Sequence, residues 1–173
     1  SVVAADAVIV GSGAGGAMAA RTLARAGLDT VVLEEGRRWT VEEFRSNHPI
    51  DRYAGLYRGA GATIALGRPS VVLPIGRAVG GTTVVNSGTC YRPPPAVQRR
   101  WHDDFGLRPA DPDRFAAHLD DVEATLRVAP VPLEVMGRNG RTLLDAAAAL
   151  GWRAAPIPRN APGCGGCCQC AIG

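Results

Sequence analysis

The feature that most constrains this chain is an apolar run that leads directly into regularly spaced glycines. Residues 8–16 read Val-Ile-Val-Gly-Ser-Gly-Ala-Gly-Gly, and an Ala-rich stretch follows them. The pattern predicts a buried strand, a tight turn and a helix over residues 15–26. Gly11 would permit the sharp turn, Gly13 would leave room for a phosphate against bare backbone, and Gly16 would let the helix pack close to the strand. The helix N-terminus would then face the phosphate.

A chain with 22 glycines can match such a glycine pattern by chance. The residues after this helix therefore decide whether the motif is interpreted as a nucleotide-binding turn. Gly27 is placed to end the helix, and Thr-Val-Val-Leu at 30–33 predicts a second strand that completes a βαβ unit. Glu34 follows, 23 positions after Gly11 and close to the offset of about 20 at which an acidic side chain binds ribose hydroxyls. A carboxylate there would also repel a 2′-phosphate, which disfavours NADP. The alternative interpretation is a solvated glutamate at a strand end.

Length and composition predict one globular domain. The chain has 173 residues, of which 46% are hydrophobic and 20% charged, with a net charge of +3. No run of about 18 apolar residues predicts a transmembrane segment. The arginines are scattered, which argues against nucleic-acid binding, and the absence of a visible signal sequence favours a cytoplasmic protein.

Coarse signals predict the remaining elements. Thr40-Val-Glu-Glu is a capping-box pattern that predicts a helix over 41–46, whereas 47–61 lacks a clear period and is interpreted as loop and irregular helix. Further predictions are a hairpin formed by 62–65 and 71–73, and helices over 95–104, 112–126 and 142–150, the second of them capped by Asp111.

The segment from Gly76 to Pro93 is dense in small residues, hydroxyls and one amide. Such a composition suits backbone that passes close to a ligand, because small side chains expose N–H groups and hydroxyls add donors. A flexible linker is the alternative. The interleaved Val79, Val84 and Val85 argue against a linker, since solvated linkers rarely carry side chains of the buried type.

Four of the five cysteines lie within seven residues near residue 170. Cys164 and Cys167 have C-x-x-C spacing, and Cys168 and Cys170 follow them. Thiolates at this spacing can bind zinc or an iron–sulfur cluster. Disulfides, or plain thiols packed at a domain junction, are the alternatives. The isolated Cys90 is expected to be buried.

Two blocks together resemble the glucose-methanol-choline (GMC) oxidoreductases, which bind FAD. They are the strand-glycine-helix unit that ends in Glu34-Glu-Gly, and the block 80–89, Gly-Gly-Thr-Thr-Val-Val-Asn-Ser-Gly-Thr. Arg92-Pro93, Arg159-Asn160 and the cysteines resemble the long-chain (fatty) alcohol oxidase or dehydrogenase branch. The resemblance implies that residues 1–173 form the N-terminal part of a Rossmann-like α/β FAD-binding domain with a parallel sheet and helical insertions. The C-terminal substrate and catalytic portion would lie outside them.

The resemblance also implies roles by position. The implied cofactor-binding residues are Gly11, Ser12, Gly13, Gly16, Glu34, Gly80, Gly81, Thr82, Asn86, Ser87 and Thr89. Some family members attach the flavin covalently to a His just before this Asn. Val85 stands in that place, so non-covalent FAD is expected.

The implied reaction is oxidation of an alcohol to a carbonyl by hydride transfer to flavin N5, assisted by a His base, with oxygen or a carrier as electron acceptor. The family's His lies in a C-terminal segment, and His48, His102 and His118 do not match it. Residues 1–173 alone are therefore expected to be inactive. Two alternatives stay open, a non-catalytic module that binds a nucleotide and a metal, and an NAD-binding Rossmann enzyme; the block 80–89 speaks against the second.

Overall fold

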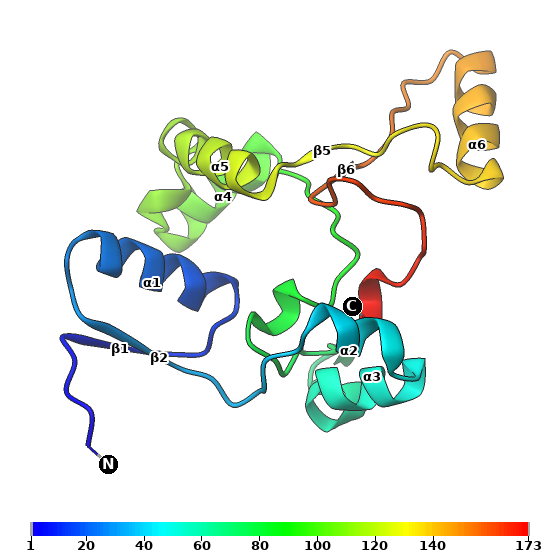
Figure 1. Cartoon of the computed structure of the whole chain (residues 1–173). Coiled ribbons are helices and arrows are strands. Elements are labelled where there is room, and N and C mark those ends of the chain that lie inside the picture. Colours follow the sequence, from blue (N-terminus) through cyan, green and yellow to red (C-terminus); the bar gives the residue numbers. More distant parts are fainter. Residues whose placement is uncertain (1, 173) are drawn as a thin grey trace. The chain divides into compact units, whose positions relative to one another are not determined.

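The computed structural model describes residues 2–172, except for the side chain of residue 172. The chain forms two compact units, one made of Ser1–Ser87 with Gln169–Gly173 and the other of Gly88–Cys168. In chain order (Figure 1) the elements are β1 (Ala7–Val10), α1 (Ala14–Arg25), β2 (Thr30–Leu33), α2 (Val41–Ser46), α3 (Pro49–Leu56), β3 (Ile64–Ala65), β4 (Val71–Val72), α4 (Pro95–Phe105), α5 (Pro112–Leu126), β5 (Ala129–Pro130), α6 (Arg138–Ala149) and β6 (Pro158–Arg159), with 3-10 turns at Arg58–Gly61, Gly81–Thr83, Arg108–Ala110 and Cys170–Ile172. Among the helices of the described chain, none is long and apolar enough to cross a membrane.

The first unit is built on the predicted βαβ unit. Strands β1 and β2 pair in parallel, with Ala7 opposite Thr30 and Val10 opposite Leu33, and α1 joins them (Figure 1). Gly27 ends the connection with a φ of 85°, the left-handed conformation expected just past a helix. Within the described residues this parallel sheet has two strands. The chain is therefore a mixed α/β structure with a small parallel sheet.

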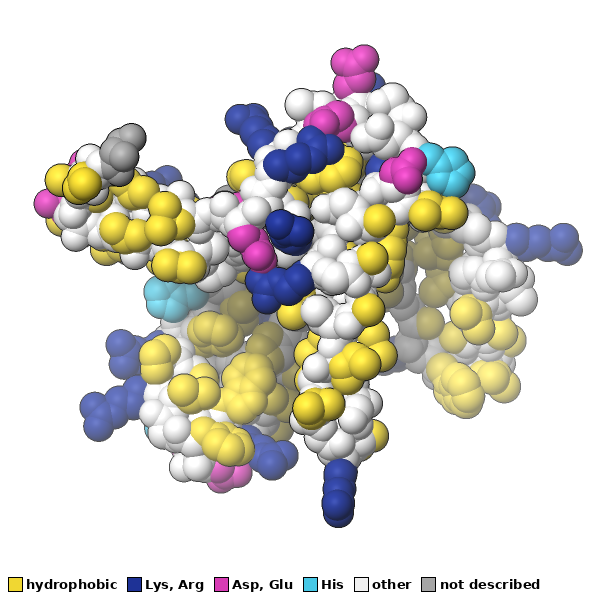
Figure 2. Space-filling model, turned by 90° about the horizontal axis from the view of Figure 1, so that it is seen from below, with side chains coloured by type: hydrophobic (Ala, Val, Ile, Leu, Met, Phe, Trp, Pro, Cys, Tyr) yellow, Lys and Arg dark blue, Asp and Glu magenta, His cyan; other side chains and the backbone are white. Residues whose placement is uncertain are grey.

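The prediction that β1 is buried is wrong for one of its faces. Ala7 and Ile9 are half-buried, whereas Val8 and Val10 are 60% and 85% exposed. Successive side chains of a strand point to opposite faces, and α1 packs against this sheet, so only one face is covered. Hydrophobic side chains are also numerous on the surface shown in Figure 2.

Two short helices and a loop enclose the core of the first unit. Thr40 caps α2 with the complete capping box that the sequence predicts. The stretch predicted as loop and irregular helix instead contains the regular helix α3. His48 caps it by accepting the Ile50 N–H, and Pro49 occupies its first turn, where the missing N–H costs nothing. The cap was missed because histidine is not a usual N-cap residue.

The core of this unit includes part of the segment after Gly76. The buried cluster consists of Leu56, Tyr57, Ala78 and Val85, with Trp39, Phe44 and Val84 packed against it. The segment is therefore anchored structure, which excludes the flexible-linker interpretation. The predicted hairpin is also present, since β3 and β4 pair antiparallel.

The second unit contains α4, α5, α6 and a short ribbon. Asp111 caps α5 as predicted, because its carboxylate accepts the N–H groups of Asp113 and Arg114. Helix α6 begins at Arg138, four residues before the predicted start. Strands β5 and β6 pair antiparallel. The Cys90 N–H donates to the Pro158 carbonyl at 2.9 Å, so the segment after Gly88 lies beside β6.

Candidate nucleotide-binding site

The three motif glycines have the separate geometries that their spacing predicts. Gly11 has a φ of 90°, which makes the sharp turn after β1. A Cβ on Gly13 would meet no described heavy atom within 4 Å, so the backbone there is open. A Cβ on Gly16 would lie 1.9 Å from the Gly11 carbonyl oxygen, so glycine is required for the close packing of α1 on the turn. The positions are thus shaped as a phosphate-binding turn requires.

The N-terminus of α1 is suited to an anion. In the described part of the chain, no side chain caps this helix and its first turn holds no acidic residue. The helix is 12 residues long, so its dipole and its first N–H groups favour negative charge at this end.

Glu34, directly after β2, joins the glycine turn to the next loop. Its Oε2 accepts the Ser12 N–H at 2.9 Å and the Ser12 hydroxyl at 2.7 Å. Its Oε1 accepts the Gly36 N–H at 2.8 Å. The Ser12 hydroxyl is the main cause that lowers the pKa of Glu34 to about 2, followed by the Gly36 and Ser12 N–H groups. Glu34 is therefore ionised at neutral pH, and hydrogen bonds from Ser12 and Gly36 hold its carboxylate in place.

The second predicted segment lies directly on the glycine turn. The Gly80 N–H donates to the Ser12 hydroxyl at 2.8 Å. A Cβ on Gly81 would lie 3.0 Å from the Gly13 Cα, so the two glycine backbones touch. The structure thus brings together two blocks that are 68 residues apart in the sequence.

An open cavity of about 510 Å³ lies over this junction. It is lined by residues from both blocks and from the strand ends, namely Val10, Gly11, Gly13, Leu33, Glu34, Glu35, Arg58, Ile75, Gly76, Gly81 and Thr82. Five of the predicted residues, at positions 11, 13, 34, 81 and 82, therefore line one cavity. It lies at the carboxyl ends of two parallel strands, where ligands bind in open α/β sheets.

The last three predicted residues, Asn86, Ser87 and Thr89, are not among the residues that line this cavity. The Asn86 side-chain amide donates to the Thr82 and Thr83 carbonyls at 3.0 and 2.8 Å, which closes the 3-10 turn there. Ser87 ends the first of the two segments that make up the first unit. Thr89 belongs to the second unit, where it forms a bridge with Arg159.

The sequence missed Arg58, Ile75 and Glu35 as cavity residues. The Arg58 Nε donates to Glu35 Oε1 at 3.0 Å, and an ion pair holds the two side chains together. Arg58 lies just after α3, in a stretch without clear periodicity, so no local pattern marks it. The acidic pair at 34 and 35 was visible, but its partner comes from 23 residues away.

The cysteines give no support to the predicted metal site. Among residues 2–172, no three His, Cys, Asp or Glu side chains converge as metal ligands. Cys164 is half-buried, whereas Cys167 and Cys168 are exposed free thiols. Cys170 belongs to the other unit. Close spacing in the sequence is therefore insufficient here, and zinc or an iron–sulfur cluster is not assigned.

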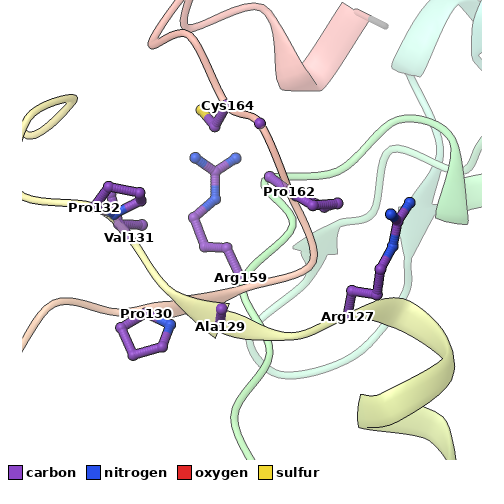
Figure 3. Close-up of a pocket in the computed structure, with 10 residues that line it drawn as sticks. Arg127, Ala129, Pro130, Val131, Pro132, Arg159, Pro162 and Cys164 are labelled. Atoms are coloured by element: carbon purple, nitrogen blue, oxygen red, sulfur yellow. The ribbon is translucent and has the colours of Figure 1, made fainter.

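A smaller cavity of about 230 Å³ lies in the second unit. Figure 3 shows the Arg159 guanidinium extending from β6 toward Cys164, with Pro132 and Pro162 on either side. The Asn160 N–H donates to the Gly88 carbonyl at 3.0 Å. Asn160, part of the Arg159-Asn160 pair that resembles the long-chain alcohol oxidase branch, thus holds the backbone that follows Ser87.

Comparison with known proteins decides the family. The family model described as GMC oxidoreductase matches residues 53–173, and the model described as FAD binding domain matches residues 6–46. The chain belongs to the GMC oxidoreductase family. The resemblance that the two glycine blocks suggested is confirmed.

Relatives of this GMC oxidoreductase chain are considerably longer than the chain. An uncharacterized GMC-type oxidoreductase of Mycobacterium tuberculosis (strain H37Rv) is 83% identical over all 173 residues, which span 28% of its length. A long-chain-alcohol oxidase of Arabidopsis thaliana is 32% identical over 97% of the chain and 22% of its own length. The crystal structure of pyridoxine 4-oxidase from Mesorbium loti matches 92% of the chain and 37% of its own, with a TM-score of 0.62 and 18% identity. This last likeness concerns the fold.

Proposed function

We propose that the chain supplies the adenine-dinucleotide part of an FAD site in an oxidoreductase that acts on the CH–OH group of an alcohol. The observation that carries the proposal is the junction of the two glycine blocks over one cavity, tied together by Ser12 and Glu34. The FAD binding domain match supports the cofactor. The name of the Arabidopsis relative supports the class of substrate.

The residues present fit the group. Gly13 offers open backbone beside the uncapped N-terminus of α1, which suits a pyrophosphate. Glu34 lines the cavity, and its Oε1 accepts the Gly36 N–H, whereas both Ser12 donors bind Oε2. Glu34 can therefore accept a ribose hydroxyl without giving up its contacts to Ser12. As an ionised carboxylate it would also repel a 2′-phosphate.

The roles of the chain's own residues follow from this fit. The glycine turn and α1 would hold the pyrophosphate, Glu34 the adenosine ribose, and Gly81 with Thr82 would line the cavity beside them. Bound FAD would supply hydride acceptance at its N5. Asn86, Ser87 and Thr89 are proposed for the flavin end.

The chain's histidines are not proposed as the catalytic base. His48 caps α3, and His102 lies beside Asp103 at the surface of α4. His118 lies within α5.

The reaction of the whole protein, its alcohol, its electron acceptor and its cytoplasmic location are proposals, because the chain spans about a quarter of the M. tuberculosis relative's length.

The visible spectrum of the purified full-length protein tests the cofactor. We expect the protein to retain flavin absorption after reconstitution with FAD, and to retain no NAD after incubation with NAD. Stoichiometric NAD binding without flavin would support the Rossmann dehydrogenase alternative. Binding of neither nucleotide would contradict both the FAD proposal and the NAD alternative. Reduction of the bound flavin by a series of primary alcohols would then identify the substrate class.

Acid precipitation of the holoprotein tests the attachment of the flavin. Val85 has no nucleophilic atom, and its side chain is buried in the core with 3% exposed. We therefore expect all of the FAD to appear in the supernatant. Flavin that stays with the precipitated polypeptide would contradict this prediction.

Replacement of Arg58 by Ala tests whether this cavity residue, which no sequence pattern indicated, contributes to FAD binding. Arg58 lines the cavity, whereas Arg77 contacts the same Glu35 at 3.9 Å without lining it. We expect Arg58→Ala to weaken FAD binding by roughly threefold to tenfold, the scale of one net hydrogen bond. Arg77→Ala is the matched control and should bind FAD as the wild type does. Equal affinities for both variants, measured by flavin fluorescence titration, would contradict a role for Arg58.

A further inference from the structure

The Ser12 side chain occupies a distinctive place in the proposed site. The family pattern assigns the glycine turn to the pyrophosphate, yet the Ser12 hydroxyl is engaged on both sides by the protein itself. It donates to Glu34 Oε2 at 2.7 Å and accepts the Gly80 N–H at 2.8 Å. A hydroxyl has one hydrogen to donate, and here it donates that hydrogen bond to the ionised carboxylate. The oxygen lone pairs are thereby left for Gly80.

Several contacts hold the segment that carries Gly80 in place. The Val79 N–H donates to the Arg37 carbonyl at 3.1 Å, and a Cβ on Gly36 would lie 2.3 Å from the Ala78 N. These contacts are between backbones. The Ser12 hydroxyl is a side-chain tie between this segment and the glycine turn, so it is a tie that one substitution can remove.

The Ser12 hydrogen bond to Gly80 lies where the glycine turn and the segment 80–82 are in contact. Gly80 has a φ of 101° and Gly81 a φ of 55°, so this turn uses conformations that side-chain-bearing residues rarely adopt. Gly81 then touches Gly13 directly. A shift of the Gly80 backbone would therefore move Gly81 and Thr82, which line the cavity.

We propose that Ser12 is a positioning residue for the cofactor. Its hydroxyl is hydrogen-bonded to both Glu34 and Gly80, and it thereby fixes the backbone of residues 80–82 against the glycine turn. This inference rests on the proposed FAD function but assigns Ser12 a task other than direct contact with phosphate. Glu34 has two tasks in consequence, one toward ribose and one toward the protein's second block.

Two measurements on the full-length protein test the proposal. Hydrogen exchange without FAD reads the tie directly, and we expect Ser12→Ala to speed exchange of the Gly80 amide at least fivefold, while residues 41–56 exchange as in the wild type. Fluorescence titration with FAD should show about tenfold weaker binding, the scale of a hydrogen bond to a charged group. Ser12→Thr keeps the hydroxyl and should restore both values. Ser46→Ala is the control, since the Ser46 hydroxyl bonds the Glu42 carbonyl within its own helix.

The outcomes separate this inference from the proposed function. Wild-type protein that binds no FAD would overturn the proposed function, and the exchange measurement would still report on the tie. Unchanged Gly80 exchange in Ser12→Ala would overturn the tie. Faster exchange with unchanged FAD affinity would overturn the positioning role, as would a Ser12→Thr variant as defective as Ser12→Ala.

Discussion

Replacement of Gly16 by Ala is expected to destabilise the protein by about 1–3 kcal/mol, the usual cost of overpacking a filled site. The new Cβ would lie 1.9 Å from the Gly11 carbonyl oxygen and 3.3 Å from Ile9 Cγ2. Backbone must shift to admit it, because a carbonyl of a tight turn cannot rotate away as a flexible side chain can. We expect FAD binding to be lost along with the shape of the turn.

The neighbouring glycine provides the control for this substitution. A Cβ on Gly15 would meet no described heavy atom within 4 Å, and Gly15 lies inside α1. Gly15→Ala should therefore leave stability unchanged or raise it by up to about 1 kcal/mol, since alanine favours a helix over glycine. Denaturant midpoints of the two variants provide the measurement. Equal destabilisation of both would show that helix propensity, not the contact with Gly11, governs this turn.

Replacement of Glu34 by Ala is expected to weaken FAD binding by about 1–3 kcal/mol, roughly fivefold to 150-fold. The substitution removes the proposed ribose acceptor and also leaves the Ser12 and Gly36 N–H groups without their carboxylate. Glu42→Ala, on the exposed α2 helix, is the control and should bind FAD normally. An affinity for Glu34→Ala equal to that of the wild type would refute the assignment of Glu34.

The same residue predicts a pH dependence of stability. The pKa of Glu34 lies at about 2 in the folded chain, below its ordinary value of 4.5. A lowered pKa means that the ionised form stabilises the fold fully above pH 4.5, and that this contribution is lost as pH falls from 4.5 toward 2. The difference in unfolding free energy between wild type and Glu34→Ala should shrink over that range. A constant difference would contradict the hydrogen bonds to the carboxylate.

The local elements of this fold could be predicted because their signals are local. The glycine spacing, the capping box at Thr40 and the proline after Asp111 each act within a few residues, so the sequence determined β1, α1, β2, α2 and α5. Helix α3 was missed because its N-cap is His48. The clustered cysteines left a metal site, disulfides and plain thiols open in the sequence, since spacing alone does not direct thiols toward one point.

What only the tertiary structure decided is how the two glycine blocks meet. Gly11 to Gly16 and Glu34 could be recognised as a dinucleotide motif, because strand, turn and helix geometry fix their neighbourhood. No pattern in the sequence shows that the Gly80 N–H lies on the Ser12 hydroxyl, or that Arg58 lines the cavity. Leu56, Ala78 and Val85 are buried in one core, and this packing places the backbone between Ala78 and Val85 next to the glycine turn. Packing across the chain, not local propensity, therefore completes the site.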